Sequence, residues 1–167
     1  MSPRFLSPLL LSLGLGFGLS LSGNSAATPP SAVAPFLGTW FTEDKEGAVV
    51  IYRCGKALCG KLHWLKPSDE PDAAFDDKNP DPKLRGRPLC GMEFMGGFTP
   101  QSDGNLSSGW IYSPRHGTTF SAALAQGHEP DTIELRGYFI LPLLGESQTW
   151  TKAASVEGCA PPAHQAK

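Results

Sequence analysis

The sequence predicts an all-β protein: a single antiparallel, up-and-down, eight-stranded barrel preceded by a signal peptide. Eight short strand-like runs follow the first 35 residues at even spacing, and turn-forming sequences separate most of them. No stretch beyond residue 27 keeps the apolar periodicity of a helix. Even spacing with short links favours an antiparallel meander over βαβ units. Eight strands close most readily into a barrel, which leaves no exposed edge; an open sandwich is the alternative.

The predicted strands are short and rich in β-branched, aromatic and aliphatic residues. They are 37–42, 48–54, 59–65, 89–98, 106–112, 118–125, 132–140 and 145–153. Alternation is clearest in 132–140, where every second residue from Ile133 to Phe139 is apolar or glycine. One face of this strand is therefore expected to point into the barrel.

Residues 1–27 are predicted to be a signal peptide, because Arg4 precedes an apolar stretch at 9–21 and small residues follow it. The apolar stretch is too short to span a bilayer, so no stable membrane insertion is expected. The rest of the chain divides into a linker, a β-barrel domain and a C-terminal tail, at 28–35, 36–153 and 154–167. Export predicts a periplasmic or secreted protein.

An exported protein meets an oxidising compartment, in which cysteines pair. Cys54 and Cys59 bracket four residues between two predicted strands, where a hairpin can bring them within disulfide distance. This spacing does not fit a zinc site, since no second ligand pair follows. Cys90 and Cys159 either form a second bridge that ties the tail to the barrel or remain as two thiols.

Tryptophans occur in the first and last predicted strands, which are neighbours in a closed meander. Gly38 and Trp40 open the first strand, and Trp150 and Lys152 lie in the last. Trp40 is expected to plug one end of the barrel, with the Lys152 ammonium over its ring. In the alternative, both tryptophans are simply large core residues.

The most informative segment is the long polar loop 67–88, which holds five prolines. Structureless loops of this length are usually functional or disordered, and fixed proline φ angles favour order. Arg85 and Arg87 suit an anionic group, but they also have acidic neighbours with which to form ion pairs. We therefore predict either a ligand clamp or a salt-bridged loop, and the two are compatible.

The same loop begins like a calcium site, with Asp77, Asn79 and Asp81 in alternation. An EF-hand needs glycine at its sixth position and glutamate at its twelfth, and Pro82 and Pro88 stand there instead. The EF-hand is excluded, and turn capping by Asp and Asn side chains is preferred over a looser calcium site. No metal and no cofactor are predicted.

Several motifs occur in a fixed order along the mature chain. They are Gly38-Thr39-Trp40, Ile51-Tyr52-Arg53-Cys54-Gly55, Leu58-Cys59-Gly60, Asn79-Pro80-Asp81-Pro82, Leu84-Arg85-Gly86-Arg87-Pro88-Leu89 and Gln148-Thr149-Trp150-Thr151. In these motifs the chain resembles the bacterial exported proteins of the domain of unknown function 2147 family, over about 36–153. The resemblance implies a secreted or periplasmic, lipocalin/calycin-like β-barrel and no established activity. Cys90 and Cys159 look like additions to the family pattern, which favours their pairing with each other.

Catalytic signatures are missing from the sequence. It contains neither the G-x-S-x-G nor the H-E-x-x-H motif, and its four histidines are scattered. The formal net charge of −2, without a basic stripe, argues against nucleic acid as a partner. His63 lies mid-strand and either points into the barrel or faces water. No enzymatic activity is predicted.

The leading hypothesis is an exported, non-enzymatic β-barrel that binds a small hydrophobic or amphipathic, lipid-like ligand, with the 67–88 loop as lid or mouth. The inward pair on 48–54 is either Val49 with Ile51 or Val50 with Tyr52. The candidate ligand-binding residues are Arg85, Arg87, Asn79, Asp81, Tyr52, Trp64, Phe120 and Phe139. The alternative is a filled barrel that binds another envelope protein through the 67–88 loop.

Overall fold

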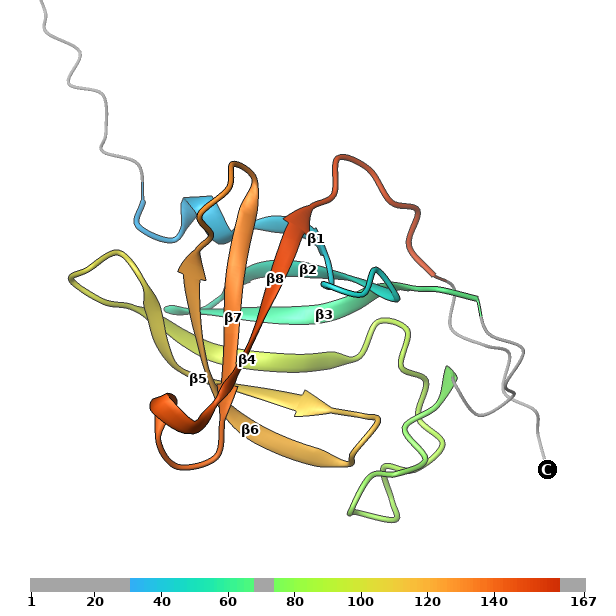
Figure 1. Cartoon of the computed structure of the whole chain (residues 1–167). Coiled ribbons are helices and arrows are strands. Elements are labelled where there is room, and N and C mark those ends of the chain that lie inside the picture. The colour runs from blue at the N-terminus through green and yellow to red at the C-terminus, as the bar shows by residue number, and fades with distance from the viewer. Residues whose placement is uncertain (1–30, 68–73, 160–167) are drawn as a thin grey trace, which may run out of the picture.

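The computed structural model describes residues 31–67 and 74–159 (Figure 1). The predicted signal peptide, residues 28–30 of the linker, residues 68–73 of the long loop and the end of the tail from 160 onwards lie outside the described residues. Among the described residues, no helix is long and apolar enough to cross a membrane.

The described chain forms one closed, antiparallel barrel of eight strands in sequence order. The strands are β1 (Gly38–Phe41), β2 (Gly47–Cys54), β3 (Ala57–Leu65), β4 (Glu93–Pro100), β5 (Leu106–Ser113), β6 (Thr118–Gln126), β7 (Thr132–Tyr138) and β8 (Glu146–Lys152). The ring closes where β1 pairs with β8, with Trp40 opposite Lys152. The predicted up-and-down barrel is confirmed, and the open sandwich is wrong.

Two predicted strands are longer than the strands observed in the structure. The predicted run 89–98 begins as a strand only at Glu93, because Leu89 to Met92 form a turn in which Gly91 has φ +77°. The predicted run 132–140 stops at Tyr138, ahead of a short 3₁₀ helix, η3 (Pro142–Leu144). Pro142 has no N–H to donate to a strand ladder, so the chain turns before it.

The closed end of the barrel is plugged by aromatic side chains. A 3₁₀ helix, η1 (Ala34–Phe36), leads into β1, and the Trp40 indole Nε1 donates a hydrogen bond to the carbonyl oxygen of Phe36 at 2.8 Å. Phe36, Trp40 and Trp150 are at most 2% exposed. The interior behind them is filled as well: the buried cluster includes Val49, Ile51, Leu58, Met95, Phe98, Leu106, Leu124 and Ile133.

Both cysteine pairs are disulfide-bonded. Cys54 and Cys59 join the ends of the β2–β3 hairpin, with Cα atoms 5.8 Å apart. Cys90 and Cys159 join the segment before β4 to the tail, with Cα atoms 5.9 Å apart. His63 holds the same part of the tail, because its backbone oxygen accepts from the Cys159 N–H at 2.8 Å. The described tail is thus fixed to the outside of the barrel at two neighbouring points.

Candidate functional site at the open end of the barrel

Inner-face side chains become exposed toward the end of the barrel opposite the aromatic plug, which we call the open end. Successive side chains of a strand point to opposite faces, so every second residue points into the barrel. The exposure of these inward residues can therefore be compared along each strand. On β7, Ile133 and Leu135 are 1% and 4% exposed, Gly137 is half-buried, and Phe139 just beyond the strand is 67% exposed. On β8, Trp150 is buried whereas Gln148 is exposed. The inner face therefore passes from core to solvent along these strands.

Apolar side chains line one side of this opening. Ile111 on β5 pairs with Phe120 on β6, and both are half-buried. The Phe120 ring lies 4.6 Å, centroid to centroid, from the ring of Phe139. Ile111 on β5, Phe120 on β6 and Phe139 just beyond the end of β7 thus form a row, which we call the mouth row.

Gly137 leaves room beside the mouth row. A Cβ atom placed on Gly137 would lie 4.0 Å from Cγ2 of Ile111, and no other atom of the described residues, apart from the glycine itself and its two chain neighbours, comes within 4 Å of that position. An ordinary side chain would extend into this space. The glycine therefore keeps the inner face open between β5 and β7.

Polar side chains border the mouth row on β8. Glu146 pairs with Gly137 and Gln148 pairs with Leu135, and both polar side chains are exposed. The Gln148 Oε1 accepts a hydrogen bond from the indole N–H of Trp150 at 3.0 Å. An apolar row beside exposed amide and carboxylate groups is the composition that suits an amphipathic molecule.

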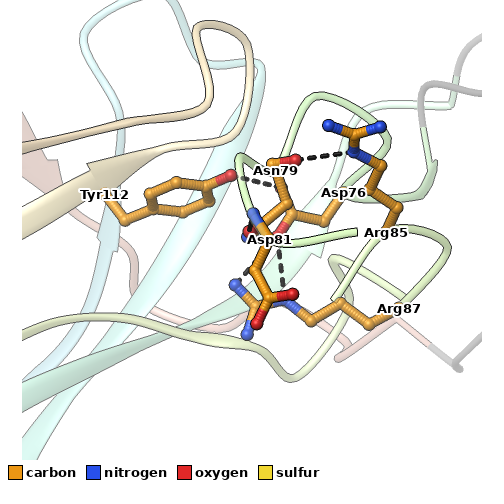
Figure 2. A network of polar contacts seen from close by, with 6 residues as sticks. All are labelled: Asp76, Asn79, Asp81, Arg85, Arg87 and Tyr112. Atoms are coloured by element: carbon orange, nitrogen blue, oxygen red, sulfur yellow. Dashed lines mark hydrogen bonds and ion pairs between the residues drawn. The ribbon is translucent and has the colours of Figure 1, made fainter. Parts of the chain in front are cut away.

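The described part of the long loop, residues 74–88, is attached to the barrel through the buried carboxylate of Asp76 (Figure 2). Asp76 is fully buried. One oxygen accepts from the Tyr112 hydroxyl at 2.6 Å, and the other accepts from Asn79 Nδ2 at 2.7 Å and from Arg87 Nε at 2.8 Å. Arg87 Nη2 contacts that same oxygen at 2.8 Å, so two guanidinium nitrogens hold one carboxylate oxygen in an ion pair.

This network changes the acidity of Tyr112. Burial, together with the hydrogen bond to the Asp76 carboxylate, raises the pKa of Tyr112 to about 12. The hydroxyl keeps its proton because an ionised tyrosine would face a carboxylate in a site with little water. Tyr112 therefore acts as a permanent donor that fastens the loop to β5.

The remaining polar residues of the loop shape its backbone. Asn79 Oδ1 accepts from the Asp81 N–H at 2.9 Å, and Asp81 Oδ1 accepts from the Lys83 N–H at 2.9 Å. Arg85 Nε donates to the Asn79 carbonyl at 2.7 Å. These are turn-capping contacts. Among the described residues, no group of three or more His, Cys, Asp or Glu side chains is placed to hold a metal ion.

We call residues 74–88 the anchored loop. It lies beside the mouth row rather than across it. Tyr112 pairs with the exposed Thr119, so its side chain leaves the outer face of β5. The loop also approaches the β5–β6 turn: a Cβ atom on Gly117 would lie 2.0 Å from the Lys78 carbonyl oxygen. Figure 1 shows this loop well apart from the loop that holds η3.

Two of the predicted site residues lie away from the opening. On β2 it is Val49 and Ile51 that are buried inside, so Tyr52 faces outward, where its hydroxyl donates to Glu93 Oε2 at 2.5 Å. That hydrogen bond, followed by burial, raises the pKa of Tyr52. Trp64 packs edge-on against Phe41, with ring centroids 6.1 Å apart. Neither residue belongs to the mouth row.

A hollow of about 150 Å³ lies on the outer face of β6 and β7. It is lined by Asn105, Ala123, Leu124, Ala125, Glu134 and Arg136. This volume is below the range of roughly 300–1,000 Å³ found for pockets that enclose a small-molecule ligand. We give it no role.

A closed eight-stranded antiparallel meander with tryptophans buried at one end has the architecture of a lipocalin-like barrel. The chain belongs to the family described as "Uncharacterized protein conserved in bacteria (DUF2147)", whose family model matches residues 38–152.

Comparison with solved structures gives the same fold. Protein HP1028 from the human pathogen Helicobacter pylori, described as belonging to the lipocalin family, is similar with a TM-score of 0.61 and 21% sequence identity. The similarity covers 71% of this chain and 82% of that protein. At this identity the likeness establishes the fold alone. No curated protein matches the sequence significantly.

Proposed function

We propose that this protein is an exported, non-enzymatic barrel that binds a small hydrophobic or amphipathic molecule at its open end. The observation that carries the proposal is the rising exposure of the inner face from Leu135 through Gly137 to Phe139. Apolar side chains that are part of a barrel interior but reach water are a favourable surface for an apolar ligand.

The ligand would lie in the mouth rather than deep inside the barrel. Trp40, Trp150 and Phe98 are at most 2% exposed and fill the closed half. Room for a side chain lies next to Gly137 and Ile111, and the half-buried Phe120 and the exposed Phe139 lie beside it. We therefore propose that the mouth row contacts the apolar part of the ligand and that the exposed part of the ligand keeps its water.

The polar part of the ligand has two groups of candidate contacts. Gln148 and Glu146 border the mouth row directly. Arg85 is exposed and uses only its Nε among the described hydrogen bonds, so it is proposed as a contact for a polar head that extends toward the anchored loop. Arg87 is proposed as a brace instead, because its guanidinium is held by Asp76.

Two features support export to the periplasm or the outside of the cell. All four cysteines are paired, which fits an oxidising compartment. The predicted signal peptide at 1–27 would direct the chain there. Edman sequencing or intact mass of the exported protein tests this part, since the expected new N-terminus lies close to Thr28.

The ligand proposal is tested with the exported protein and the probe N-phenyl-1-naphthylamine, whose fluorescence rises in apolar surroundings. The test variant is Gly137→Leu, whose side chain would occupy the free space at the mouth without removing a buried group. The matched control is Ser121→Leu, which adds the same side chain to the exposed outer face of β6. Native mass spectrometry after solvent extraction reports any molecule that co-purifies.

Saturable probe binding that falls about tenfold in Gly137→Leu and is kept in Ser121→Leu is the expected result. Equal binding by both variants, or no binding by the unchanged protein, would overturn the proposal. Urea unfolding of each variant separates loss of the site from loss of the fold.

A second candidate function is supported by the exposed tip of the anchored loop, residues 81–86. Its base is fixed by Asp76, while Leu84 at the tip is 39% exposed. A rigid, exposed loop is a suitable surface for another envelope protein. Retention of that partner by Gly137→Leu, and its loss in Leu84→Ser, would favour this function over ligand binding.

A further inference from the structure

The loop between β7 and β8 carries an unusual concentration of exposed apolar side chains. Seven large apolar residues are exposed among the described residues, and five of them lie within 139–144. Their exposed fractions are 67% for Phe139, 86% for Ile140, 55% for Leu141, 86% for Leu143 and 79% for Leu144. Figure 1 shows that this segment projects from the body of the barrel. We call residues 139–144 the apolar loop.

The apolar loop is preformed, because its backbone makes hydrogen bonds within the protein. The Leu144 N–H donates to the Leu141 carbonyl at 3.0 Å, which closes the turn of η3. Arg136 lies beneath and donates through Nε to the Pro142 carbonyl at 2.6 Å and through Nη2 to the Leu143 carbonyl at 3.2 Å. Pro142 has no N–H to satisfy. Several polar groups of the loop are thus paired before it meets any partner.

The charge and the arrangement of the exposed side chains indicate what kind of partner fits the apolar loop. Residues 137–145 carry no charged side chain, and charge returns at each base with Arg136 and Glu146. The exposed residues are consecutive, so their side chains do not share one flat face. A fluid apolar medium can surround such a loop, whereas a flat protein surface would cover only part of it.

The size of the loop argues against a second copy of this chain as the occupant. A stable protein interface buries about 800 Å² on each partner and uses roughly 20–30 residues a side. The apolar loop offers six residues, and the strand ends that flank it are the half-buried Tyr138 and the charged Glu146. A loop this small can dock by insertion, but it does not supply a dimer interface alone.

We propose that the apolar loop inserts its side chains into the surface of a phospholipid bilayer. Peripheral proteins hold to membranes by burying apolar side chains at the boundary between headgroups and acyl chains. Backbone groups that are already hydrogen-bonded cost less to move out of water. The charged groups of Arg136 and Glu146 would stay at the headgroup level.

Docking in this orientation brings the mouth row to the membrane. Phe139 belongs both to the apolar loop and to the mouth row through its contact with Phe120. A lipid-like molecule could then pass between bilayer and barrel without crossing water. The docking step itself does not depend on the proposed ligand site, and either can be present without the other.

The test is co-flotation of the exported protein with phosphatidylcholine vesicles, and with vesicles that also contain phosphatidylglycerol. The exported form is required because the apolar stretch at 9–21 would bind lipid by itself. The loop variant is Ile140→Ser with Leu143→Ser, which changes two side chains that are 86% exposed and so leaves the core intact. The conservative control is Ile140→Leu with Leu143→Ile, and Leu84→Ser is an exposed apolar change outside the loop.

We expect both kinds of vesicle to bind the unchanged protein and both controls, and the partition coefficient of the serine variant to fall by about tenfold or more. Absence of vesicle binding, or equal binding by the serine variant, would overturn the proposal. A dimer in solution that the serine variant abolishes would overturn it in favour of a second copy.

The serine variant should still bind N-phenyl-1-naphthylamine in solution, since Ile111, Phe120 and Gly137 are unchanged. Gly137→Leu should bind vesicles normally while losing the probe. These opposite results keep failure of the docking proposal distinct from failure of the ligand-site proposal.

Discussion

The ammonium of Lys152 lies 4.2 Å from the centroid of the Trp40 ring, at the seam where the last strand of the barrel meets the first. The same ammonium donates to the Leu37 carbonyl oxygen just before β1. Gly38 makes the approach possible, because a Cβ on it would lie 3.0 Å from Lys152 Nζ, and its φ of +110° disfavours other residues. One cation therefore ties together the plug, the N-terminal turn and the barrel closure.

Replacing Lys152 by Met should lower the free energy of unfolding by about 1 to 2 kcal/mol, because the methyl group keeps the packing but loses the cation–π contact and a hydrogen bond. Lys152→Arg keeps a cation and should lose less. Urea unfolding followed by tryptophan fluorescence measures both. A Met variant as stable as the unchanged protein would show that the plug holds without the cation.

The plugged end of the barrel is the part of the fold that the sequence predicted best. Gly38, Trp40, Trp150 and Lys152 lie in two short segments, and a closed meander makes those segments neighbours. Short-range patterns and one topological rule were sufficient there. Nothing comparable marks Asp76 and Tyr112, which are 36 residues apart in the sequence, with β4 between them.

Gly117→Ala should destabilise the protein by detaching the anchored loop from the β5–β6 turn. Gly117 has φ +62°, and a Cβ on it would lie 2.0 Å from the Lys78 carbonyl oxygen, so the backbone of the loop must move. The control is Gly104→Ala, where φ is +85° but no atom lies within 4 Å. Both variants carry the cost of a positive φ, and only Gly117→Ala adds overpacking.

The Gly117 variant should therefore lose about 1 to 3 kcal/mol more than the Gly104 variant in urea unfolding. Proteolysis should also cut residues 74–88 faster in Gly117→Ala, because the loop would open locally. Equal losses of unfolding free energy in the two variants would mean that the anchored loop moves away from residue 117 without destabilising the protein.

Tyr112→Phe should remove a pH dependence of stability at alkaline pH. The folded state raises the pKa of Tyr112 from 10.0 to about 12, so it binds the phenolic proton more tightly than the unfolded chain does. The resulting stabilisation is complete below pH 10 and is lost as the pH rises through about 12. For a shift of this size it amounts to at most roughly 3 kcal/mol.

The measurement is the difference in unfolding free energy between the unchanged protein and Tyr112→Phe across pH 8 to 12, which cancels groups common to both. The difference should shrink as the pH rises above 10. A constant difference would mean that the hydroxyl contributes only its hydrogen bond to Asp76. Tyr52→Phe is a useful comparison, since its hydroxyl lies at an exposed site.

The candidate site was predicted less well than the fold, and the reasons are physical. Phe120 and Phe139 were named from strand alternation, but alternation cannot show that the inner face opens between them. Tyr52 was named because two registers of β2 were equally consistent with the sequence. The predicted strand 132–140 took in the first two residues of the apolar loop, although Pro142 shortly after it could have indicated an earlier end.

The disulfides give a prediction that depends on chain length. Cys90 and Cys159 are 69 residues apart, whereas Cys54 and Cys59 are 5 apart. In the chain-entropy account, the longer closed loop restricts the unfolded chain more, by about 4 kcal/mol against about 2 kcal/mol. Cys90→Ser with Cys159→Ser should therefore cost about twice as much stability as Cys54→Ser with Cys59→Ser.

In each double variant, other contacts still hold the segment that the disulfide joined. Without Cys90–Cys159 the tail keeps the bond from the Cys159 backbone N–H to the His63 carbonyl, so a serine at 159 can still lie in place. Without Cys54–Cys59 the β2–β3 pairing keeps its ladder along the rest of both strands. Both variants should thus fold, and urea midpoints can be compared directly. A larger loss from the short hairpin pair would show that its contribution is to register in the folded barrel rather than to the entropy of the unfolded chain.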